Sequence, residues 1–298
     1  MDEATNRGWE YREQLGAQAR GQSVLGYLSA RYERASEETW RGRIERGEVW
    51  LDGAKASAGQ QLRPGSELTW RRPPWVEPQV PLDFAVLYED EELLAVAKPS
   101  GLPCVPAGGF LEHTLLAQVR RRDPRWSPMH RLGRGTSGLV LFAGTEEARS
   151  RVQSAWRGEG VEKWYRALAG GPMPRAPFEV EAPIGPVEHP VLGSIFAASP
   201  AGRRASSHVE PIAPAAEGWV AAVRIATGRP HQIRIHLAFA GHPLVGDPIY
   251  GPGGLPRTAA LPGEGGYCLH SWRLGLVHPL TGRRLELEAP LPERLRTG

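Results

Sequence analysis

A proline-rich segment at residues 72–83 limits the fold of this chain more than any other feature. It holds four prolines in twelve residues, which prevents a continuous helix and favours an extended linker. Apolar residues recur periodically on both sides of it, and a length of 298 residues suits two domains. We therefore expect an N-terminal extension at 1–21, a small domain at 22–71, this linker, and a larger domain at 84–298.

The small domain shows two helix patterns followed by short strands. Apolar residues from Val24 to Tyr32 recur at helical spacing, which predicts a first helix. Ser36, followed by two glutamates, is typical of the N-cap of a second helix, which Gly47 ends. Strands and turns follow at residues 49–70, whereas the polar residues 1–20 predict no more than a loose or marginal helix.

The larger domain is dominated by strand patterns and has few helices, which predicts an α+β fold with a central, mostly antiparallel sheet. In the segment 231–237, alternation places Ile233, Ile235 and Leu237 on one strand face and the polar side chains on the other. Such a strand either forms one wall of a cleft or turns its polar face to water. The expected helices span 113–122 and 145–158, and the expected strands span 86–88, 93–97, 139–143, 164–169, 219–226, 231–237 and 285–288.

Composition indicates a soluble globular protein, with 41% hydrophobic and 23% charged residues. No apolar run approaches the roughly 18 residues of a membrane span, and the polar N-terminus predicts no secretory signal. Two isolated cysteines, Cys104 and Cys268, form no disulfide framework, so we expect a reduced cytoplasm. A monomer is the default expectation, because the sequence does not indicate an oligomeric state. We expect no metal site, because His231 and His236 would point to opposite strand faces.

Charge is distributed unevenly along the chain. The formal net charge is +3, yet residues 120–166 hold 11 basic and 5 acidic side chains. A basic block of this kind attracts polyanions such as RNA, although it is also compatible with an ordinary solvated surface.

Several motifs together resemble those of the RluA-type pseudouridine synthases. Residues 130–138 have the sequence HRLGRGTSG and precede an apolar run, as in that family's HRLD-x-x-TSG motif. Residues 227–251 are similar to its TGR-x-HQIR pattern with the GHP and GD-x-x-YG segments that follow. Residues 88–101, 162–168 and 269–292 match in the same order, so the chain is identified as a member of this family over about residues 84–293.

The resemblance implies an RNA-modifying isomerase that converts uridine to pseudouridine without a metal or organic cofactor. Tyr165 would stack on the uracil, Arg131 would help to flip or hold the nucleotide, and Leu237 would pack beneath the base. Arg234 would pair with the catalytic aspartate. That aspartate is missing, because Gly133 stands at its position. The other substrate-binding positions that the resemblance implies are His130, Leu132 and Thr136.

A glycine cannot act as a nucleophile at C1′ or as a base at C2′, so three interpretations stay open. Another carboxylate acts in its place; the protein binds RNA without modifying it, as a chaperone or assembly factor; or it catalyses altered chemistry. If no other group substitutes, Arg234 would lose its partner and face RNA as an unpaired cation. The candidate carboxylates by motif position are Asp90, Glu112, Asp123 and Asp247, the last more typical of a turn cap.

Residues 22–71 resemble an S-four-type RNA-binding domain, a small αL-type N-terminal domain, on the pattern of two helices and a hairpin. The resemblance implies that the second helix and its adjoining loop contact structured RNA, with ribosomal RNA ahead of transfer RNA. Packing against another protein is the alternative. The implied RNA-binding residues are Arg31, Arg34, Arg41, Arg43 and Arg46.

Overall fold

The computed structural model describes residues 4–32, 35–158, 160–191, 193–257 and 265–297. The chain divides into two compact units, Met1–Glu77 and Pro78–Gly298. The division falls inside the proline-rich segment. No helix among the described residues is long and apolar enough to cross a membrane.

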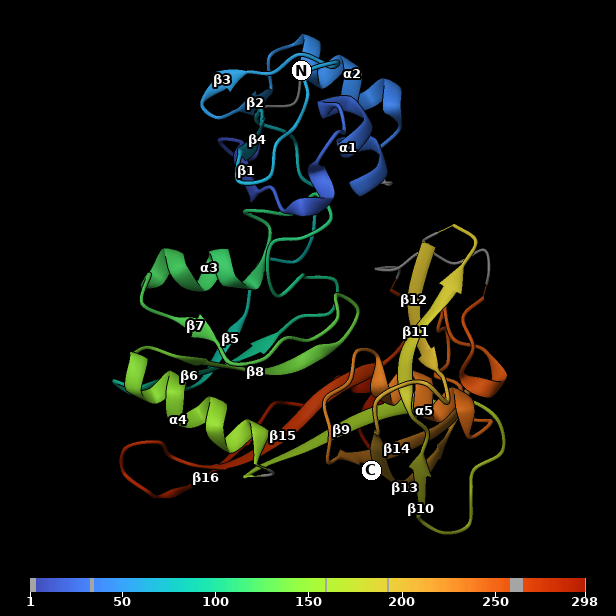
Figure 1. Ribbon diagram of the computed structural model, residues 1–298. Coiled ribbons are helices and arrows are strands. Elements are labelled where there is room, and N and C mark those ends of the chain that lie inside the picture. The colour runs from blue at the N-terminus through green and yellow to red at the C-terminus, as the bar shows by residue number, and fades with distance from the viewer. Residues whose placement is uncertain (1–3, 33–34, 159, 192, 258–264, 298) are drawn as a thin grey trace. The chain divides into compact units, whose positions relative to one another are not determined.

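Unit 1 packs two helices on a four-stranded sheet of order β1-β4-β2-β3 (Figure 1). Ser23 and Ser36 cap the helices by accepting hydrogen bonds from Gly26 N and Thr39 N. The core combines Leu28, Trp40 and Val49 with other apolar residues from both helices and the sheet. The elements are α1 (Val24–Arg31), α2 (Glu37–Glu45), β1 (Trp9–Gln14), β2 (Val49–Leu51), β3 (Ala54–Lys55), β4 (Glu67–Arg72) and a 3₁₀ turn, η1 (Ala17–Ala19).

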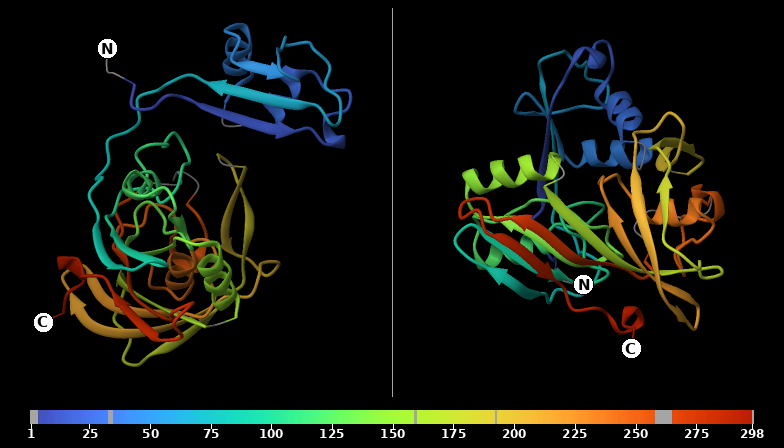
Figure 2. Two further views of the ribbon diagram at one scale, coloured as in Figure 1. Left: turned by 90° about the vertical axis from the view of Figure 1, so that its left-hand side faces the viewer. Right: turned by 90° about the horizontal axis from the view of Figure 1, so that it is seen from below.

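The prediction of a loose segment or marginal helix at residues 1–20 was wrong. β1 runs antiparallel to the whole length of β4, and Figure 2 shows the two strands side by side in blue and cyan. Its residues pair from Trp9 opposite Arg72 to Gln14 opposite Glu67. The Tyr11 ring stacks on Trp70 at 5.0 Å between centroids. A cross-strand aromatic pair of this kind is a stabilising contact that periodicity within residues 1–20 cannot reveal.

Unit 2 is built on a ten-stranded sheet with the strand order β10-β13-β14-β9-β15-β8-β6-β5, to which β16 and β7 add at β15 and β8. All named pairings are antiparallel except β15 with β8, which confirms the mostly antiparallel α+β fold. The strands are β5 (Ala85–Glu89), β6 (Leu93–Lys98), β7 (Ser127–Pro128), β8 (Ser137–Ala143), β9 (Val161–Ala169), β10 (Phe178–Glu181), β13 (Ser206–Ala215), β14 (Gly218–Ile225), β15 (Leu269–Val277) and β16 (Arg284–Glu288), with a separate hairpin of β11 (Ile184–His189) and β12 (Gly193–Ala198).

Helices cover both faces of the β6–β8 part of this sheet (Figure 1). On one face α4 (Glu146–Arg157) packs its Val152 with Leu139 and Leu141. On the other, α3 (Leu115–Arg122) packs its Val119 with Val140. Because consecutive residues of a strand point to opposite faces, both faces bury apolar side chains. Two short 3₁₀ turns, η2 (Pro252–Gly254) and η3 (Glu293–Leu295), complete the unit.

The predicted strand at 231–237 is instead a helix, α5 (Gln232–Phe239). Its residues from 232 to 238 are all buried, because Leu237 faces the large sheet and Ile235 faces the β11–β12 hairpin. A helix that is buried on all sides has no polar stripe, so its sequence shows no 3.6-residue period. The alternation of polar and apolar residues in this segment therefore resembles a strand pattern. The argument that separated His231 from His236 by strand faces therefore falls as well.

Candidate active site

A small cavity of about 110 Å³ collects the two strongest motifs. This volume is smaller than the several hundred cubic ångströms of a site that encloses a whole small molecule. The cavity therefore suits a single ring that projects from a larger ligand. Among the described residues, the lining contains arginines, tyrosines, a histidine and apolar side chains, and no aspartate or glutamate. The lining residues are Arg131, Leu132, Gly133, Thr136, Tyr165, Ile225, Arg229, His231, Gln232, Ile233, Arg234, Tyr267 and Leu269.

The loop at residues 130–136 is held from beneath by the Lys98–Gly101 turn. Lys98 is 1% exposed, and its Nζ donates to the carbonyls of Pro99, Leu102 and Arg134. The Gly101 N–H also donates to the Arg134 carbonyl, and Ser100 Oγ donates to the Gly135 carbonyl at 2.8 Å. Burial lowers the pKa of Lys98 to about 8. A compact ammonium with three donors suits this clamp.

Two glycines of that loop lie against one aromatic ring. A Cβ built on Gly133 would lie 3.4 Å from Tyr267 Oη and 3.6 Å from Thr136 Oγ1. A Cβ on Gly135 would lie 3.0 Å from Tyr267 Cζ. The backbone of Gly133 has an ordinary negative φ, so glycine is not required there by conformation. The site could therefore accept a side chain at position 133.

Arg234 is not the unpaired cation that the missing aspartate led us to expect. Its Nε and Nη2 each donate to Asp247 at 2.7 Å, and both residues are 4% exposed. Burial alone would lower the pKa of Arg234, but the hydrogen bonds and charge of Asp247 outweigh burial and raise it. Asp247 Oδ1 also accepts from the N–H groups of Ile249 and Tyr250, so the same carboxylate caps the turn.

None of the four candidate carboxylates lines the cavity. Asp247 is buried behind Arg234, as described above. Glu112 pairs with Arg121 at 2.9 Å and Asp123 pairs with Arg125 at 2.9 Å, both on the surface. A replacement carboxylate is therefore absent from the walls of the cavity among the described residues.

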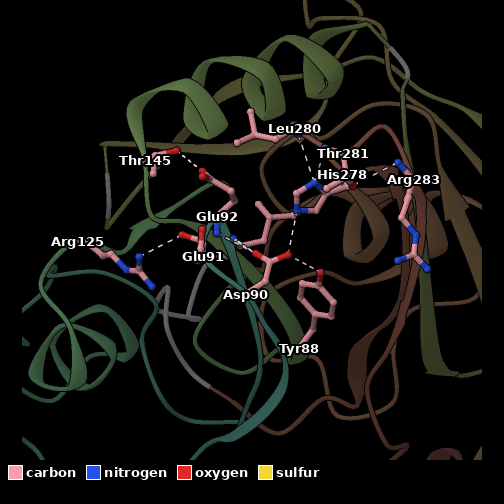
Figure 3. Close-up of polar contacts among 11 residues, drawn as sticks. Tyr88, Asp90, Glu91, Glu92, Arg125, Thr145, His278, Leu280, Thr281 and Arg283 are labelled. Carbon is pink, nitrogen blue, oxygen red and sulfur yellow. Dashed lines mark hydrogen bonds and ion pairs between the residues drawn. The ribbon is translucent and has the colours of Figure 1, made fainter.

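The fourth candidate, Asp90, belongs to a separate group shown in Figure 3, which we call the Asp90 cluster: Tyr88, Asp90 and His278 with their backbone partners. Asp90 accepts from Tyr88 Oη and His278 Nε2 on one oxygen, and from the Glu92 and Leu93 amides on the other. His278 Nδ1 accepts from the Leu280 and Thr281 amides, so its Nε2 carries the proton. The cluster joins the β5–β6 turn to the turn after β15.

The other expected site residues divide between the cavity and the core. Leu132, Thr136 and Arg131 line the cavity, as does Tyr165, whose pKa burial raises to about 12. His130 does not line it: Nε2 accepts from Leu141 N at 3.0 Å and the ring stacks on Trp156 at 4.7 Å.

Leu237 is buried in the core, and the apolar floor comes instead from three other residues, Ile225, Ile233 and Leu269. Arg229, His231 and Gln232 line the cavity although no role was assigned to them; they lie in the 227–251 motif, which was the available signal. Tyr267 had no signal beyond its position before the 269–292 match.

His231 and Gln232 shape the cavity wall through fixed contacts. His231 has φ +55° and its Nδ1 contacts Tyr250 Oη at 2.7 Å, while burial lowers its pKa to about 4, so the ring is neutral. Gln232 Oε1 accepts from Thr227 Oγ1 and Arg229 N, which closes the turn before α5.

The arginines expected to bind RNA are on or near α1 and α2 in unit 1, where each described one has a local partner. Arg41 pairs with Glu37 and Arg46 with Glu48, both at 2.8 Å, and Arg31 lies 3.5 Å from Glu13. The Arg43 guanidinium lies 4.5 Å from the Trp40 ring centroid and 4.3 Å from that of Trp70. Arg34 lies outside the described residues.

Comparisons with known proteins converge on one family. The sequence model described as RNA pseudouridylate synthase matches residues 92–239. An uncharacterized RNA pseudouridine synthase of Synechocystis is 44% identical over 279 residues, covering 92% of this chain and 96% of that protein. RNA pseudouridine synthase 5 of Arabidopsis thaliana is 37% identical, covering 87% of this chain and 85% of that protein.

More distant relatives extend the match. Ribosomal large subunit pseudouridine synthase D of Pseudomonas aeruginosa is 31% identical over 314 residues, covering 98% of this chain and 94% of that protein. The solved structure of human RNA pseudouridylate synthase domain containing 4 has a TM-score of 0.55 at 22% identity, covering 71% of this chain and 90% of the other. The structural likeness supports the fold.

Proposed function

Because this chain belongs to the RNA pseudouridine synthase family, we propose that it isomerises uridine to pseudouridine in structured RNA, with ribosomal RNA favoured over transfer RNA. The name of the Pseudomonas relative, which refers to the large ribosomal subunit, supports that order. We propose that it acts as a monomer in the cytoplasm, which fits its two unpaired cysteines.

The observation that carries the proposal is the cavity that gathers Tyr165, Arg131 and Arg234 from three distant segments. The reaction breaks the C1′–N1 bond, turns the uracil and joins C5 to C1′. A base flipped out of a duplex or loop needs an aromatic or apolar pocket, and the Tyr165 ring above the floor of Ile225 and Leu269 offers one. Arg131 is exposed at the cavity and can bind phosphate.

The test compares cellular RNA from a strain that lacks this protein with RNA from the parent strain. Pseudouridine mapping by mass label should find at least one site that disappears and returns when the gene is restored. Purified protein should then form pseudouridine at that site in RNA from the deletion strain.

A second candidate is RNA binding without modification, favoured by the lack of a carboxylate among the described residues that line the cavity. In that case the pseudouridine map would be unchanged while the purified protein still bound the same RNA. Binding under either function is proposed to involve Arg31, Arg41, Arg43 and Arg46 of unit 1, together with Arg34. Replacement of Arg43 by alanine should weaken RNA binding and reduce its salt dependence.

A further inference from the structure

Tyr267 occupies the space that the two loop glycines leave empty. It is 5% exposed, its Oη lies 3.4 Å from the Cβ position of Gly133, and its Cζ lies 3.0 Å from the Cβ position of Gly135. A bulky side chain at Gly135 would collide with this ring, whereas position 133 has room. Glycine at 135 and tyrosine at 267 are therefore matched, and the phenol oxygen lies beside the position of the missing aspartate.

The Tyr267 ring also contacts Arg234. The Arg234 guanidinium carbon lies 4.2 Å from the ring centroid, and Asp247 holds that guanidinium through two hydrogen bonds. Thr136 Oγ1 lies 3.4 Å from the Tyr267 hydroxyl. Asp247 and Arg234 thus act through Tyr267: they position a ring that lines the cavity.

Few other groups in the cavity could bond to a sugar carbon. His231 already contacts Tyr250 Oη through Nδ1 and is part of the turn before α5. Thr136 is a secondary alcohol, and its alkoxide is a much poorer leaving group from C1′ than a phenolate. Tyrosine is a known nucleophile at a sugar carbon, as in sialidases. Of the two cavity tyrosines, Tyr267 is the one beside Gly133.

Resting on the proposed function, we propose that the Tyr267 hydroxyl is the nucleophile at C1′ of the target uridine, in place of the carboxylate absent at position 133. In the first step Oη bonds to C1′, the C1′–N1 bond pair leaves with the uracil, and the phenol proton passes to N1. After the ring turns, C5 bonds to C1′ and the C1′–Oη pair returns to oxygen. The proton lost from C5 restores the phenol.

The scheme closes without any co-reactant. The phenol proton becomes the N1–H of pseudouridine, and the C5 proton replaces it on Tyr267. One group therefore serves as acid, nucleophile and final base, so the scheme needs no carboxylate from the cavity walls.

The test is single-turnover pseudouridine formation by the full-length protein on the RNA site identified above. Tyr267→Phe keeps the ring against Gly133 and Arg234 but removes the oxygen, and it should lower the rate by about 10³-fold or more. The RNA affinity of the variant should stay within about twofold of the parent protein, and its urea midpoint should equal that of the parent within error. The matched control, Tyr88→Phe, removes a phenol that bonds Asp90 outside the cavity and should leave the rate within about twofold.

A second measurement looks for the bond itself. Parent protein stopped with denaturant during turnover and digested to peptides should carry ribose-linked RNA on the peptide that contains Tyr267. Gly133→Asp added to Tyr267→Phe should regain at least about tenfold in rate, because a Cβ at position 133 meets only ordinary contacts and the nearest of them, the Tyr267 oxygen, is absent from the phenylalanine variant.

The outcomes separate the two proposals. A parent protein that forms pseudouridine while Tyr267→Phe is equally fast overturns this inference and leaves the proposed function intact, as does a sugar adduct on another residue. A parent protein that forms no pseudouridine on any cellular RNA overturns the proposed function and this inference with it.

Discussion

The cavity and the Asp90 cluster hold similar side chains and use them in opposite ways. The cluster places the Tyr88 phenol and the His278 imidazole each within 3.0 Å of the Asp90 carboxylate, and many catalytic sites contain these three groups (Figure 3). Every oxygen of Asp90 already accepts two hydrogen bonds, however, and His278 Nδ1 is occupied by backbone amides. The cluster is consequently saturated.

The cavity has the reverse character. In the part of the chain that the structure describes, its lining holds no carboxylate, but it includes Tyr165 and Tyr267. The nearby acidic residue Asp247 does not line the cavity, because it is buried in an ion pair with Arg234. The difference teaches that a set of reactive residue types is not sufficient for a reactive site, because the polar atoms of the Asp90 cluster are already bonded to one another and to the backbone. Substitutions in the two regions should separate rate from stability accordingly.

The largest effect is expected from Asp247→Asn. It leaves Arg234 as a buried cation without a full partner, which costs about 3–5 kcal/mol of unfolding free energy. The Tyr267 ring would lose its fixed neighbour, so the single-turnover rate should also fall by at least about tenfold. Urea unfolding and single-turnover assays on the folded fraction measure the two effects.

A control for Asp247→Asn is Glu37→Gln, which breaks the exposed pair with Arg41 and should cost no more than about 0.5 kcal/mol. Equal losses of unfolding free energy in the two variants would show that the buried Arg234–Asp247 pair stabilises the protein no more than an exposed pair does.

The next effect concerns Lys98, which joins the cavity loop to the sheet. The pKa of Lys98 is about 8 in the folded protein and about 10.4 in the unfolded chain. Because the unfolded chain binds the proton more tightly, the protonated lysine lowers the free energy of unfolding, and it does so in full below pH 8. This destabilisation disappears as the pH rises from about 8 to 10.4, and stability should gain on the order of 3 kcal/mol over this range. Lys98→Met should abolish the gain and slow the reaction by about tenfold, because the Arg134 carbonyl loses its ammonium donor.

Urea midpoints measured between pH 7 and pH 10.5 check this prediction. Lys55→Met, at an exposed lysine of β3, is the matched control and should follow the parent protein. If Lys98→Met shows the same rise with pH as the parent, the titrating group is a different one.

Sequence patterns predicted the parts of the fold that are locally determined. The capped helices of unit 1, both helices beside β6 and β8, and most strands of the large sheet fall where the patterns placed them, because caps and periodicity are local signals. β1 was missed because its stability comes from β4, more than fifty residues away. α5 was mistaken for a strand because both of its sides are buried.

For the site, motif resemblance led to Arg131, Tyr165 and Arg234, but not to how they pair. The partner of Arg234 is thirteen residues away across a turn, and nothing in the spacing distinguishes a capping aspartate from an ion-pair partner. Tyr267 lies more than 130 residues after the loop in sequence, and no motif marked it as a site residue. Only the structure shows that its ring fills the space beside Gly133 and Gly135.

The smallest effect, and the sharpest contrast with the cavity, is expected from Asp90→Asn. Burial alone would raise the pKa of Asp90, but hydrogen bonds from Tyr88 and from the Leu93 and Glu92 amides hold it below its usual range. Its contribution to stability is therefore present above about pH 4 and is lost as the pH falls through the lower, folded-state value. At pH 7 the variant should lose about 1–3 kcal/mol, and the difference from the parent should shrink in acid. The rate per folded molecule should not change, because no residue of the Asp90 cluster lines the cavity.

The matched control is Asp123→Asn, at an exposed pair with Arg125, which should change neither the stability nor the rate measurably. A loss of rate in folded Asp90→Asn would mean that the two regions are coupled, and the division between a saturated cluster and a reactive cavity would have to be abandoned.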